Sequence, residues 1–375
     1  MSNPSNQKKY WVIFYQDAKQ WMHIFHSSLR SGKSFQAQVV VRYVGEKNKL
    51  TGEASVRKRP EDKHDSEGRG ALRNEADNLA SLERDLKGKG SSLGDAHIAE
   101  LLRKTDRASK DAPHSVINVE ASYWKLYNLG SLHGVLLKLR SHDAARSTLP
   151  AVAARCAGHM LIAIKSSLVT PERGLLHNDI VSGNVFVHFP PGGNEKLPDF
   201  YLGDWGDSKT ENRPRWRVAG VRESLKSLDR ILGEIKQLQT AESTVYDQLS
   251  GVLNSIFTEA PNSDQLLLAF LAKRLEKAVE TAAQLEKTAL EAVAGSIDSV
   301  TAILKSFVIV PEPARYRTVE EAEAVVEAKQ LRGCTLQLVE NGKIDFRKGQ
   351  VPGGSDSSSS SDSSMADLVG DLAGL

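Results

Sequence analysis

Cysteine is scarce in this chain, with only Cys156 and Cys334 among 375 residues. Two cysteines so far apart exclude a disulfide framework and a zinc-ligand spacing, and they suit a reducing compartment. We expect both to be ordinary buried thiols. An excess of either charge is also missing, since 49 Lys and Arg residues stand against 47 Asp and Glu residues. The composition therefore gives no reason to expect nucleic acid as a partner.

Long hydrophobic runs are missing as well. The first residues lack the basic region and apolar core of a secretory signal, and we expect no run with the roughly 20 apolar residues of a membrane span. We therefore predict a cytoplasmic or nuclear protein without a membrane partner. The 40% hydrophobic and 26% charged residues are enough for a packed core. The length suits one large two-lobed domain or two ordinary ones.

The first third of the chain carries strand signals and one helix signal. The helix is expected over residues 71–86, where leucines and alanine recur at helical spacing. Residues 104–114 are polar and are expected to form a loop. Strands are expected at residues 11–15, 36–44, 53–59 and 115–126.

Helix signals dominate the rest of the chain until its last part. Helices are expected over residues 149–168, 221–238, 243–257, 264–307 with a break near Gly295, and 319–330 with Thr318 as the cap. For residues 264–307 a protruding coiled coil is the alternative. Strands at 334–339 and 343–346 flank Asn341-Gly342, which predicts a two-residue hairpin turn. This order predicts an α+β fold with two unequal lobes.

The most informative motif is a pair of apolar runs that each end in a carboxylate. Asp179 follows Leu175-Leu176-His177-Asn178, and Asn184 comes five residues after it. Asp204 follows Leu202-Gly203 and precedes Trp205-Gly206. Phosphoryl transfer from ATP needs one carboxylate near the attacking hydroxyl, and an amide with a second carboxylate to hold Mg²⁺. A turn in which Asp and Asn only cap backbone groups would explain one of these loops, but not both in this order.

The two runs resemble the catalytic loop and the metal-binding loop of the protein-kinase-like superfamily, H-x-D-x-x-x-x-N and D-x-G. The resemblance implies a small β-rich N-terminal lobe, a larger helical C-terminal lobe, and ATP with Mg²⁺ as cofactors. It makes Asp179 the catalytic base and Asn184 and Asp204 the metal ligands. His177 is expected to hold the loop backbone rather than to titrate.

The same resemblance implies a cation on the ATP phosphates and an acid that orients it. Side chains alternate along the strand at residues 53–59, so Val56 and Lys58 share one face and are expected to point inward. Lys58 on this face is the predicted cation. Arg57 is the alternative, because a register slip of one residue exchanges the faces. Glu75 lies on the following helix, 17 residues after Lys58, and is the predicted partner.

The remaining nucleotide contacts are predicted less directly. Asn128 and Leu129 stand where the family joins its lobes, and their backbone is expected to bind adenine. Gly32 is the one glycine in the place of the phosphate-covering loop. A P-loop reading of Gly32-Lys33-Ser34 fails, because Ser27 occupies the position of the first glycine.

Two departures from protein kinases bear on the branch of the family. Val181 replaces the lysine that Ser/Thr kinases place two residues after the catalytic Asp. Only 17 residues separate Asp204 from the helix expected at 221, and no Ala-Pro-Glu occurs there. The missing lysine is similar to choline-kinase-like and aminoglycoside-phosphotransferase-like enzymes, and the short stretch implies a reduced or absent activation segment. The spacing of Lys58 and Glu75 and the sequence Gly130-Ser131-Leu132 are instead similar to protein kinases, so both branches stay open. Trp205 replaces the usual Phe, and Gly206 is expected to give the metal loop freedom to turn.

The expected domains follow from these assignments. They are an N-terminal extension at 1–28, a kinase-like N-lobe at 29–132, a C-lobe at 133–310, a helix-and-hairpin extension at 311–350, and a disordered Ser/Asp-rich tail at 351–375. The predicted function is an ATP- and Mg²⁺-dependent phosphotransferase that acts on a hydroxyl of a protein or a small molecule. A pseudokinase that binds nucleotide as a scaffold is the alternative, and a helical interaction protein is a third.

Overall fold

The computed structural model is a mixed α+β fold. It describes residues 9–16, 22–29, 35–44, 49–60, 66–108, 117–169, 172–190, 195–239, 243–258, 260–261, 264–309, 314–329, 331 and 334–351. The Ser/Asp-rich tail and Gly32 lie outside these ranges.

The chain forms two compact units. Unit 1 contains Met1–Gly68, Arg103–Leu126 and Pro311–Leu375, and unit 2 contains Arg69–Leu102 and Tyr127–Val310. This grouping differs from the expected domain boundaries at both ends of the chain, since residues 1–28 and 311–350 belong with the expected N-lobe strands. The helix expected at 71–86 belongs to unit 2 instead.

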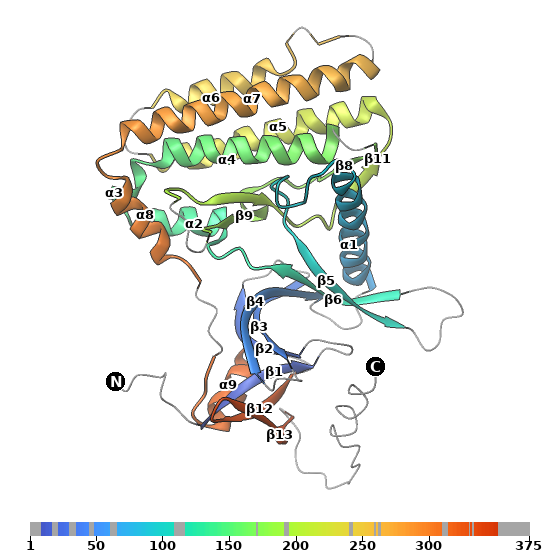
Figure 1. Ribbon diagram of the computed structural model, residues 1–375, viewed down its shortest axis with the longest axis vertical. Helices are drawn as coiled ribbons and strands as arrows, with labels where there is room; N and C mark the ends of the chain where they lie inside the picture. Colours follow the sequence, from blue (N-terminus) through green and yellow to red (C-terminus); the bar gives the residue numbers. More distant parts are fainter. Residues whose placement is uncertain are drawn as a thin grey trace. The chain divides into compact units, whose positions relative to one another are not determined.

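Unit 1 is built on one antiparallel sheet with the strand order β13-β12-β1-β2-β3-β4-β6-β5 (Figure 1). Its strands are β1 Lys9–Gln16, β2 Met22–Leu29, β3 Phe35–Val44, β4 Lys49–Pro60, β5 Leu101–Ala108, β6 Ile117–Lys125, β12 Thr335–Glu340 and β13 Lys343–Gln350. The strands expected in this unit are confirmed. Two more were not expected: β2 in the first third of the chain, and β5, which covers part of the expected loop at 104–114.

Alternating residues of β1 face the two sides of this sheet. Val12 and Phe14 are buried on one side with Ile24 of β2 and Val339 of β12. Ile13 and Tyr15 are buried on the other side against helix α9, Val319–Ala328. Each side of the strand is therefore fixed by its own apolar cluster, which sets the register of β1 between β2 and β12.

The C-terminal helix and hairpin of unit 1 match the sequence signals for them. Thr318 caps α9, and its hydroxyl accepts a hydrogen bond from the Glu321 backbone N–H at 3.3 Å. Between β12 and β13, Asn341 and Gly342 both have positive φ angles, of 51° and 80°. This is the two-residue turn that Asn-Gly favours, because both central residues must adopt the left-handed conformation.

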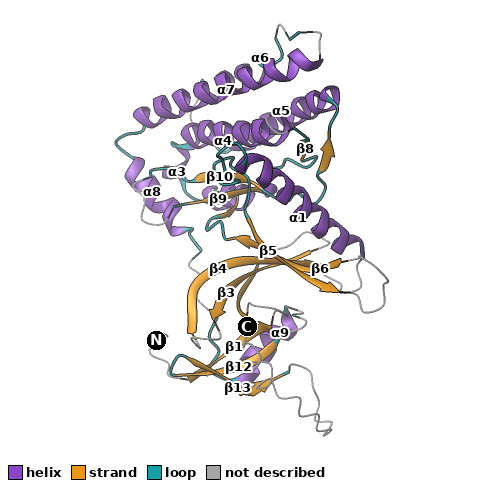
Figure 2. Cartoon of the chain, turned by 45° about the vertical axis from the view of Figure 1, so that its right-hand side comes forward, coloured by secondary structure: helices purple, strands orange, loops and turns teal. Residues whose placement is uncertain are grey.

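Unit 2 is mainly helical and is centred on α4, which packs against α5, α6 and α7 (Figures 1 and 2). Its longer helices are α1 Ser66–Lys87, whose first residues belong to unit 1, α4 Leu149–Ile164, α5 Pro214–Lys236, α6 Val245–Ser255 and α7 Asp264–Ala292, and its shorter ones are α2 Leu132–Leu139, α3 Asp143–Arg146 and α8 Ile297–Ser306. The break near Gly295 is confirmed. Residues 264–292 are not a protruding coiled coil, because Leu271, Leu275 and Ala282 are fully buried.

Helix α4 continues through a π-helical turn, Lys165–Val169. Among the described residues the combined segment Leu149–Val169 is long and apolar enough to cross a membrane, with a mean hydropathy of 1.3. The expectation that no run reaches this length was therefore wrong. However, 67% of the most apolar 18-residue window of this segment is buried inside the structure. Such burial is typical of the core helix of a soluble protein.

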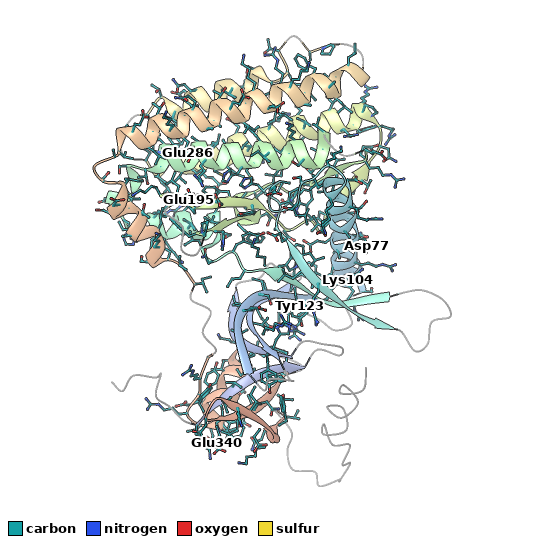
Figure 3. The ribbon with its side chains drawn as sticks, viewed as in Figure 1. Asp77, Lys104, Tyr123, Glu195, Glu286 and Glu340 are labelled. Atoms are coloured by element: carbon teal, nitrogen blue, oxygen red, sulfur yellow. The ribbon has the colours of Figure 1, made fainter. Side chains whose placement is uncertain are left out.

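Unit 2 also contains short strands, and β10 among them packs against α4 (Figure 2). They are β7 Gly130–Ser131, β9 Val185–His188 and β10 Asp199–Leu202 in one sheet, and β8 Gly174–Leu176 with β11 Lys209–Glu211 in another. Arg155 of α4 ties β10 and α7 together, since its guanidinium lies 2.8 Å from both Asp199 and Glu286. Glu286 is labelled on α7 in Figure 3. Cys156 and Cys334 are free and buried, as expected.

Candidate functional site

The candidate catalytic loop connects two short strands of unit 2. Strand β8 ends at Leu176, residues 177–181 form an irregular turn, and a single 3₁₀ turn, Ser182–Asn184, leads into β9. Strand β8 is fixed by pairing with β11, and β9 lies between β7 and β10. The loop is therefore held at both ends by paired strands.

Asp179 and Asn184 face each other across this loop. The Asn184 side-chain Nδ2 donates to the Asp179 Oδ2 at 2.8 Å and to the Asp179 backbone oxygen at 2.9 Å. Because both hydrogen bonds use the amide nitrogen, the Asn184 Oδ1 points away from Asp179. The structure thus brings together the predicted base and one of the two predicted metal ligands.

The antiparallel pairing of β9 and β10 brings the second carboxylate to the same loop. Leu202 is the Cα partner of Val185, and the Gly203 backbone N–H donates to the Asn184 backbone oxygen at 2.9 Å. Asp204 follows directly and is only partly exposed. The loops that carry Asn184 and Asp204 are therefore neighbours, linked by a backbone hydrogen bond.

The His177 side chain links the two loops through hydrogen bonds to the backbone of each. Its Nε2 lies 2.8 Å from the Gly203 oxygen, and its Nδ1 accepts from the Asp179 N–H at 3.3 Å. These partners assign a neutral imidazole with the proton on Nε2. Burial lowers the pKa of His177, although the Gly203 carbonyl and the nearby Asp204, Asp179 and Asp207 carboxylates oppose the shift. The His177 ring therefore holds the backbone of Asp179 and Gly203 in place, as expected from the sequence.

The backbone is strained at two positions of this site. Asn178 has a φ of 67° and Asp204 a φ of 58°, and both are outside the region that L-residues normally adopt. The Asn178 side chain offsets part of the strain by donating to the Asp207 backbone oxygen at 2.8 Å. Such conformations cost about 1–3 kcal/mol each and concentrate at functional sites. Here the two strained residues are Asp204 itself and the neighbour of Asp179.

Gly203 is required by close packing at the start of the Asp204 loop. A Cβ at this position would lie 2.2 Å from the Phe186 Cε2 and 3.2 Å from the Ala99 Cβ. Trp205 is fully buried beside His177, with ring centroids 4.5 Å apart. An apolar anchor and a tight backbone approach therefore fix the residues on both sides of Asp204.

Helix α1 supports the Asp204 loop with two side chains one turn apart. The buried Glu75 carboxylate accepts from the Trp205 backbone N–H at 2.8 Å. Asn78 donates from Nδ2 to the Ser208 hydroxyl at 3.0 Å, and that hydroxyl donates to the Trp205 oxygen. Sequence reasoning missed Asn78 and Ser208. Their only signal was the helical spacing of Asn78 from Glu75.

Arg217 of α5 is a buried cation that the sequence analysis also missed. Its guanidinium donates to three backbone oxygens, those of Leu168 at 2.7 Å, Val169 at 2.9 Å and Glu172 at 3.1 Å. Leu168 and Val169 end the α4 segment, where a helix terminus leaves carbonyls without partners, and Glu172 lies between that segment and β8. Arg217 therefore fixes the chain immediately before β8 and the candidate catalytic loop.

Lys58 and Arg57 lie on opposite faces of β4 in unit 1, as the alternation predicted. The Lys58 ammonium is 4.7 Å from the Phe35 ring centroid. Arg57 stacks on Tyr15 at 4.4 Å and donates to the Gln38 Oε1 at 3.3 Å. Because Glu75 belongs to unit 2, its pairing with Lys58 stays a prediction.

The predicted adenine contacts are already used inside unit 2. The Asn128 side chain donates to the Phe189 oxygen and accepts from its N–H, both at 2.7 Å. The Asn128 backbone oxygen accepts from the Ile309 N–H, and the Leu129 N–H donates to the Val187 backbone oxygen. Leu129 is buried. This segment therefore fastens β9, and its role in adenine binding stays a prediction.

The departures from the kinase pattern have clear positions. Val181 is 41% exposed in the place of the family's lysine. Helix α5 begins at Pro214 rather than at the expected 221, so the stretch after Asp204 is shorter still. Gly206 has no positive φ, and a Cβ there would meet nothing closer than the Asp204 Oδ1 at 3.9 Å. The observed backbone does not need glycine at 206.

Within the described part of the chain, no group of three or more His, Cys, Asp or Glu side chains is arranged to hold a metal ion. The predicted Mg²⁺ ligands, Asn184 and Asp204, are one amide and one carboxylate. The donor set fits Mg²⁺, which binds one or two protein oxygens and completes its shell with water and phosphate oxygens. The Asn184 Oδ1 accepts no hydrogen bond from the described residues.

Comparisons with known proteins identify no relatives. No protein-family description matches the chain. No curated protein matches it either. The function must therefore be inferred from the site.

Proposed function

We propose that this chain is an ATP- and Mg²⁺-dependent phosphotransferase with a protein-kinase-like fold. The observation that carries the proposal is the geometry around Asp179, whose Oδ2 lies 2.8 Å from the Asn184 amide nitrogen. The loop of Asp204 is hydrogen-bonded to the Asn184 backbone. These two acids and one amide are the side chains that phosphoryl transfer needs.

In this proposal Asp179 orients the acceptor hydroxyl and receives its proton. Asn184 holds Asp179 through its nitrogen and leaves its Oδ1 for a cation. Asn184 and Asp204 would hold Mg²⁺, which neutralises charge on the phosphates when bound. The neutral His177 keeps both loops in register, because it bonds to the backbone of Asp179 and of Gly203.

The experiment compares wild type with Asp204→Ala and Asp179→Asn. We expect Mg²⁺ and ATP together to raise the melting temperature of wild type. Asp204→Ala should lose this shift, because it lacks the carboxylate ligand. Asp179→Asn should keep the shift and lose ATP turnover, since it retains an acceptor for the Asn184 amide. Unchanged turnover in Asp204→Ala would refute the proposal.

A pseudokinase scaffold is the second candidate. Two observations favour it: only Gly32 represents the glycine loop, and the stretch between Asp204 and α5 at Pro214 is short and has no Ala-Pro-Glu. A scaffold predicts the melting-temperature shift without turnover of any acceptor. A helical interaction protein, the third possibility, predicts no nucleotide effect.

A further inference from the structure

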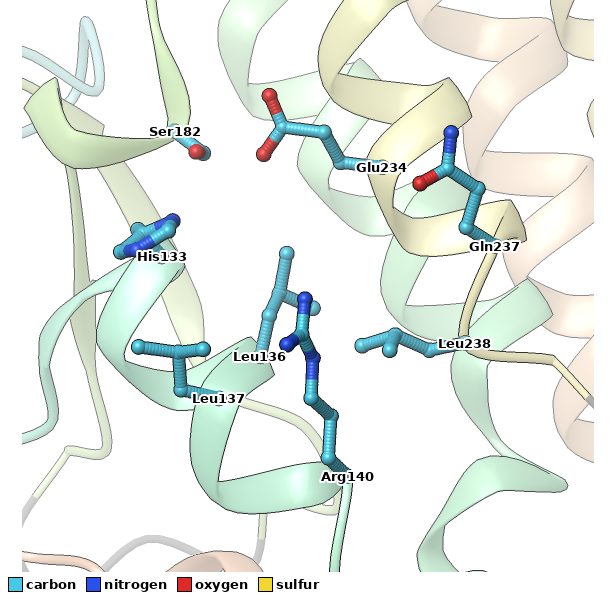
Figure 4. Close-up of a pocket in the computed structure, with 8 residues that line it drawn as sticks. All are labelled: His133, Leu136, Leu137, Arg140, Ser182, Glu234, Gln237 and Leu238. Carbon is cyan, nitrogen blue, oxygen red and sulfur yellow. The ribbon is translucent and has the colours of Figure 1, made fainter.

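A pocket of about 470 Å³ lies beside the candidate catalytic loop in unit 2 (Figure 4). Its volume is in the range of small-molecule sites, about 300–1,000 Å³. Three elements line it: α2 with the residue that follows it, the 3₁₀ turn of the catalytic loop, and the end of α5. The lining residues are His133, Leu136, Leu137, Arg140, Ser182, Glu234, Gln237 and Leu238.

The pocket adjoins the proposed chemistry through Ser182. This residue is 4% exposed, follows Asp179 by three residues, and begins the turn that ends at Asn184. A molecule that fills the pocket therefore touches the same short loop that presents Asp179.

Two opposite charges face the pocket without bonding to each other. Figure 4 shows the carboxylate of Glu234 and the guanidinium of Arg140 both directed into its space. Within the described residues, neither side chain has an ion-pair partner within 4.0 Å. Both side chains are exposed to solvent, and an acid and a base that border one pocket can each bind the opposite charge of a bridging ligand. An ammonium suits Glu234, and a carboxylate suits the bidentate fork of Arg140.

The rest of the lining is suited to a short carbon chain. Leu136 is buried, and Leu137 is 46% exposed on the same helix. Together with Leu238 they give the pocket an apolar wall. A long polycation or a bare inorganic ion would leave this wall, or one of the two charges, without a complementary group.

We infer that this pocket binds the phosphoryl acceptor, and that the acceptor is a small zwitterion whose amine and carboxylate flank a hydroxyl-bearing carbon chain. This inference rests on the proposed function. The hydroxyl oxygen forms a bond to the γ-phosphorus of ATP, and the bond from that phosphorus to the β–γ bridging oxygen breaks. ADP leaves, and the hydroxyl proton passes to Asp179. The products are a phosphate ester, ADP and one proton.

Three matched probes test the recognition of charge. They are 4-amino-3-hydroxybutanoate, which carries both charges, 1-aminopropan-2-ol, which lacks the carboxylate, and 3-hydroxybutanoate, which lacks the amine. Binding is measured by calorimetry on the full chain, with and without Mg²⁺ and a non-hydrolysable ATP analogue, and turnover is measured with ATP. We expect the zwitterion to bind at least about tenfold more tightly than either single-charge probe.

The variants are Glu234→Gln and Arg140→Gln. Glu234→Gln should weaken binding of the zwitterion about tenfold and leave 3-hydroxybutanoate unaffected, while Arg140→Gln should spare 1-aminopropan-2-ol instead. The matched controls are Glu223→Gln and Arg230→Gln, exposed residues of α5 that do not line the pocket. Both controls should keep the affinity and turnover of wild type.

The outcomes separate this inference from the proposed function. A zwitterion that binds no better than the single-charge probes, or equally well to both pocket variants, overturns the inference even where Mg²⁺ and ATP stabilise the chain. Charge-dependent binding without any nucleotide effect overturns the acceptor role together with the proposed function. Charge-dependent binding with turnover of the zwitterion supports both.

Discussion

The hydrogen bond between Glu75 and Trp205 gives the most direct prediction about what stabilises the Asp204 loop. Glu75 is 1% exposed, and its Oε1 accepts the Trp205 backbone N–H at 2.8 Å. Glu75→Ala leaves that buried N–H without an acceptor, which costs about 1–3 kcal/mol. Glu75→Gln keeps an oxygen at the same place and should cost less than about 1 kcal/mol. Stability should therefore fall in the order wild type, Gln, Ala.

The assay is urea unfolding of the full chain, followed by circular dichroism, with the midpoint compared between variants. Asp77→Ala is the control, because Asp77 lies on the same helix with a side chain 55% exposed in an ion pair with Arg73. Surface pairs of this kind contribute about 0.5 kcal/mol or less.

A second readout follows from the position of Glu75 behind the Asp204 loop. Glu75→Ala should reduce the melting-temperature shift from Mg²⁺ and ATP, whereas Asp77→Ala should keep it. If Glu75→Ala is no less stable than Asp77→Ala, the hydrogen bond to Trp205 does not hold the loop and the reasoning is refuted.

Two further predictions address the packing and the titration of unit 2. Gly203→Ala should destabilise the chain by about 1–3 kcal/mol, because its Cβ would lie 2.2 Å from Phe186. The control is Gly233→Ala on α5, where an added Cβ has no neighbouring atom within 4 Å, so this change should be neutral or stabilising. Both variants are compared with wild type by thermal unfolding. Equal melting temperatures for the two variants would contradict the packing argument. Burial lowers the pKa of His159 to about 2, so its uptake of a proton on unfolding costs stability as the pH falls below about 6.5. At pH 5 this cost is about 2 kcal/mol, and His159→Asn, whose Oδ1 can accept the Phe200 N–H as the His159 Nδ1 does at 3.1 Å, should lose about that much less stability between pH 8 and pH 5. An unchanged pH dependence in urea titrations would show that His159 is not the group responsible.

Local sequence signals predicted most elements because each signal is itself local. The Asn341-Gly342 turn needs two positive φ angles, and Thr318 needs only an N–H three residues away. The helices over residues 149–168 and 264–307 followed from the spacing of apolar residues, including the break near Gly295. Strands β2 and β5 were missed because their place in the sheet depends on partners elsewhere in the chain.

The candidate site was predicted only in part. The motif spacing indicated Asp179, Asn184 and Asp204, and the structure places them on neighbouring loops of unit 2. Asn78 and Arg217 could not be predicted, because each bonds to groups far away in sequence, a hydroxyl for Asn78 and backbone oxygens for Arg217. Their side chains carry no local pattern that separates them from solvated polar residues.

The sequence by itself determined the longer helices, the strand alternation, the hairpin turn and the pair of acidic loops, since these depend on residues a few positions apart. The short helices α2 and α3 were not predicted. Tertiary structure alone decided that β1 shares one sheet with β12 and β13, and that residues from α2, the catalytic loop and α5 line one pocket. The physical reason is that long-range pairing and burial depend on which distant surfaces complement each other, and no short stretch of sequence records this.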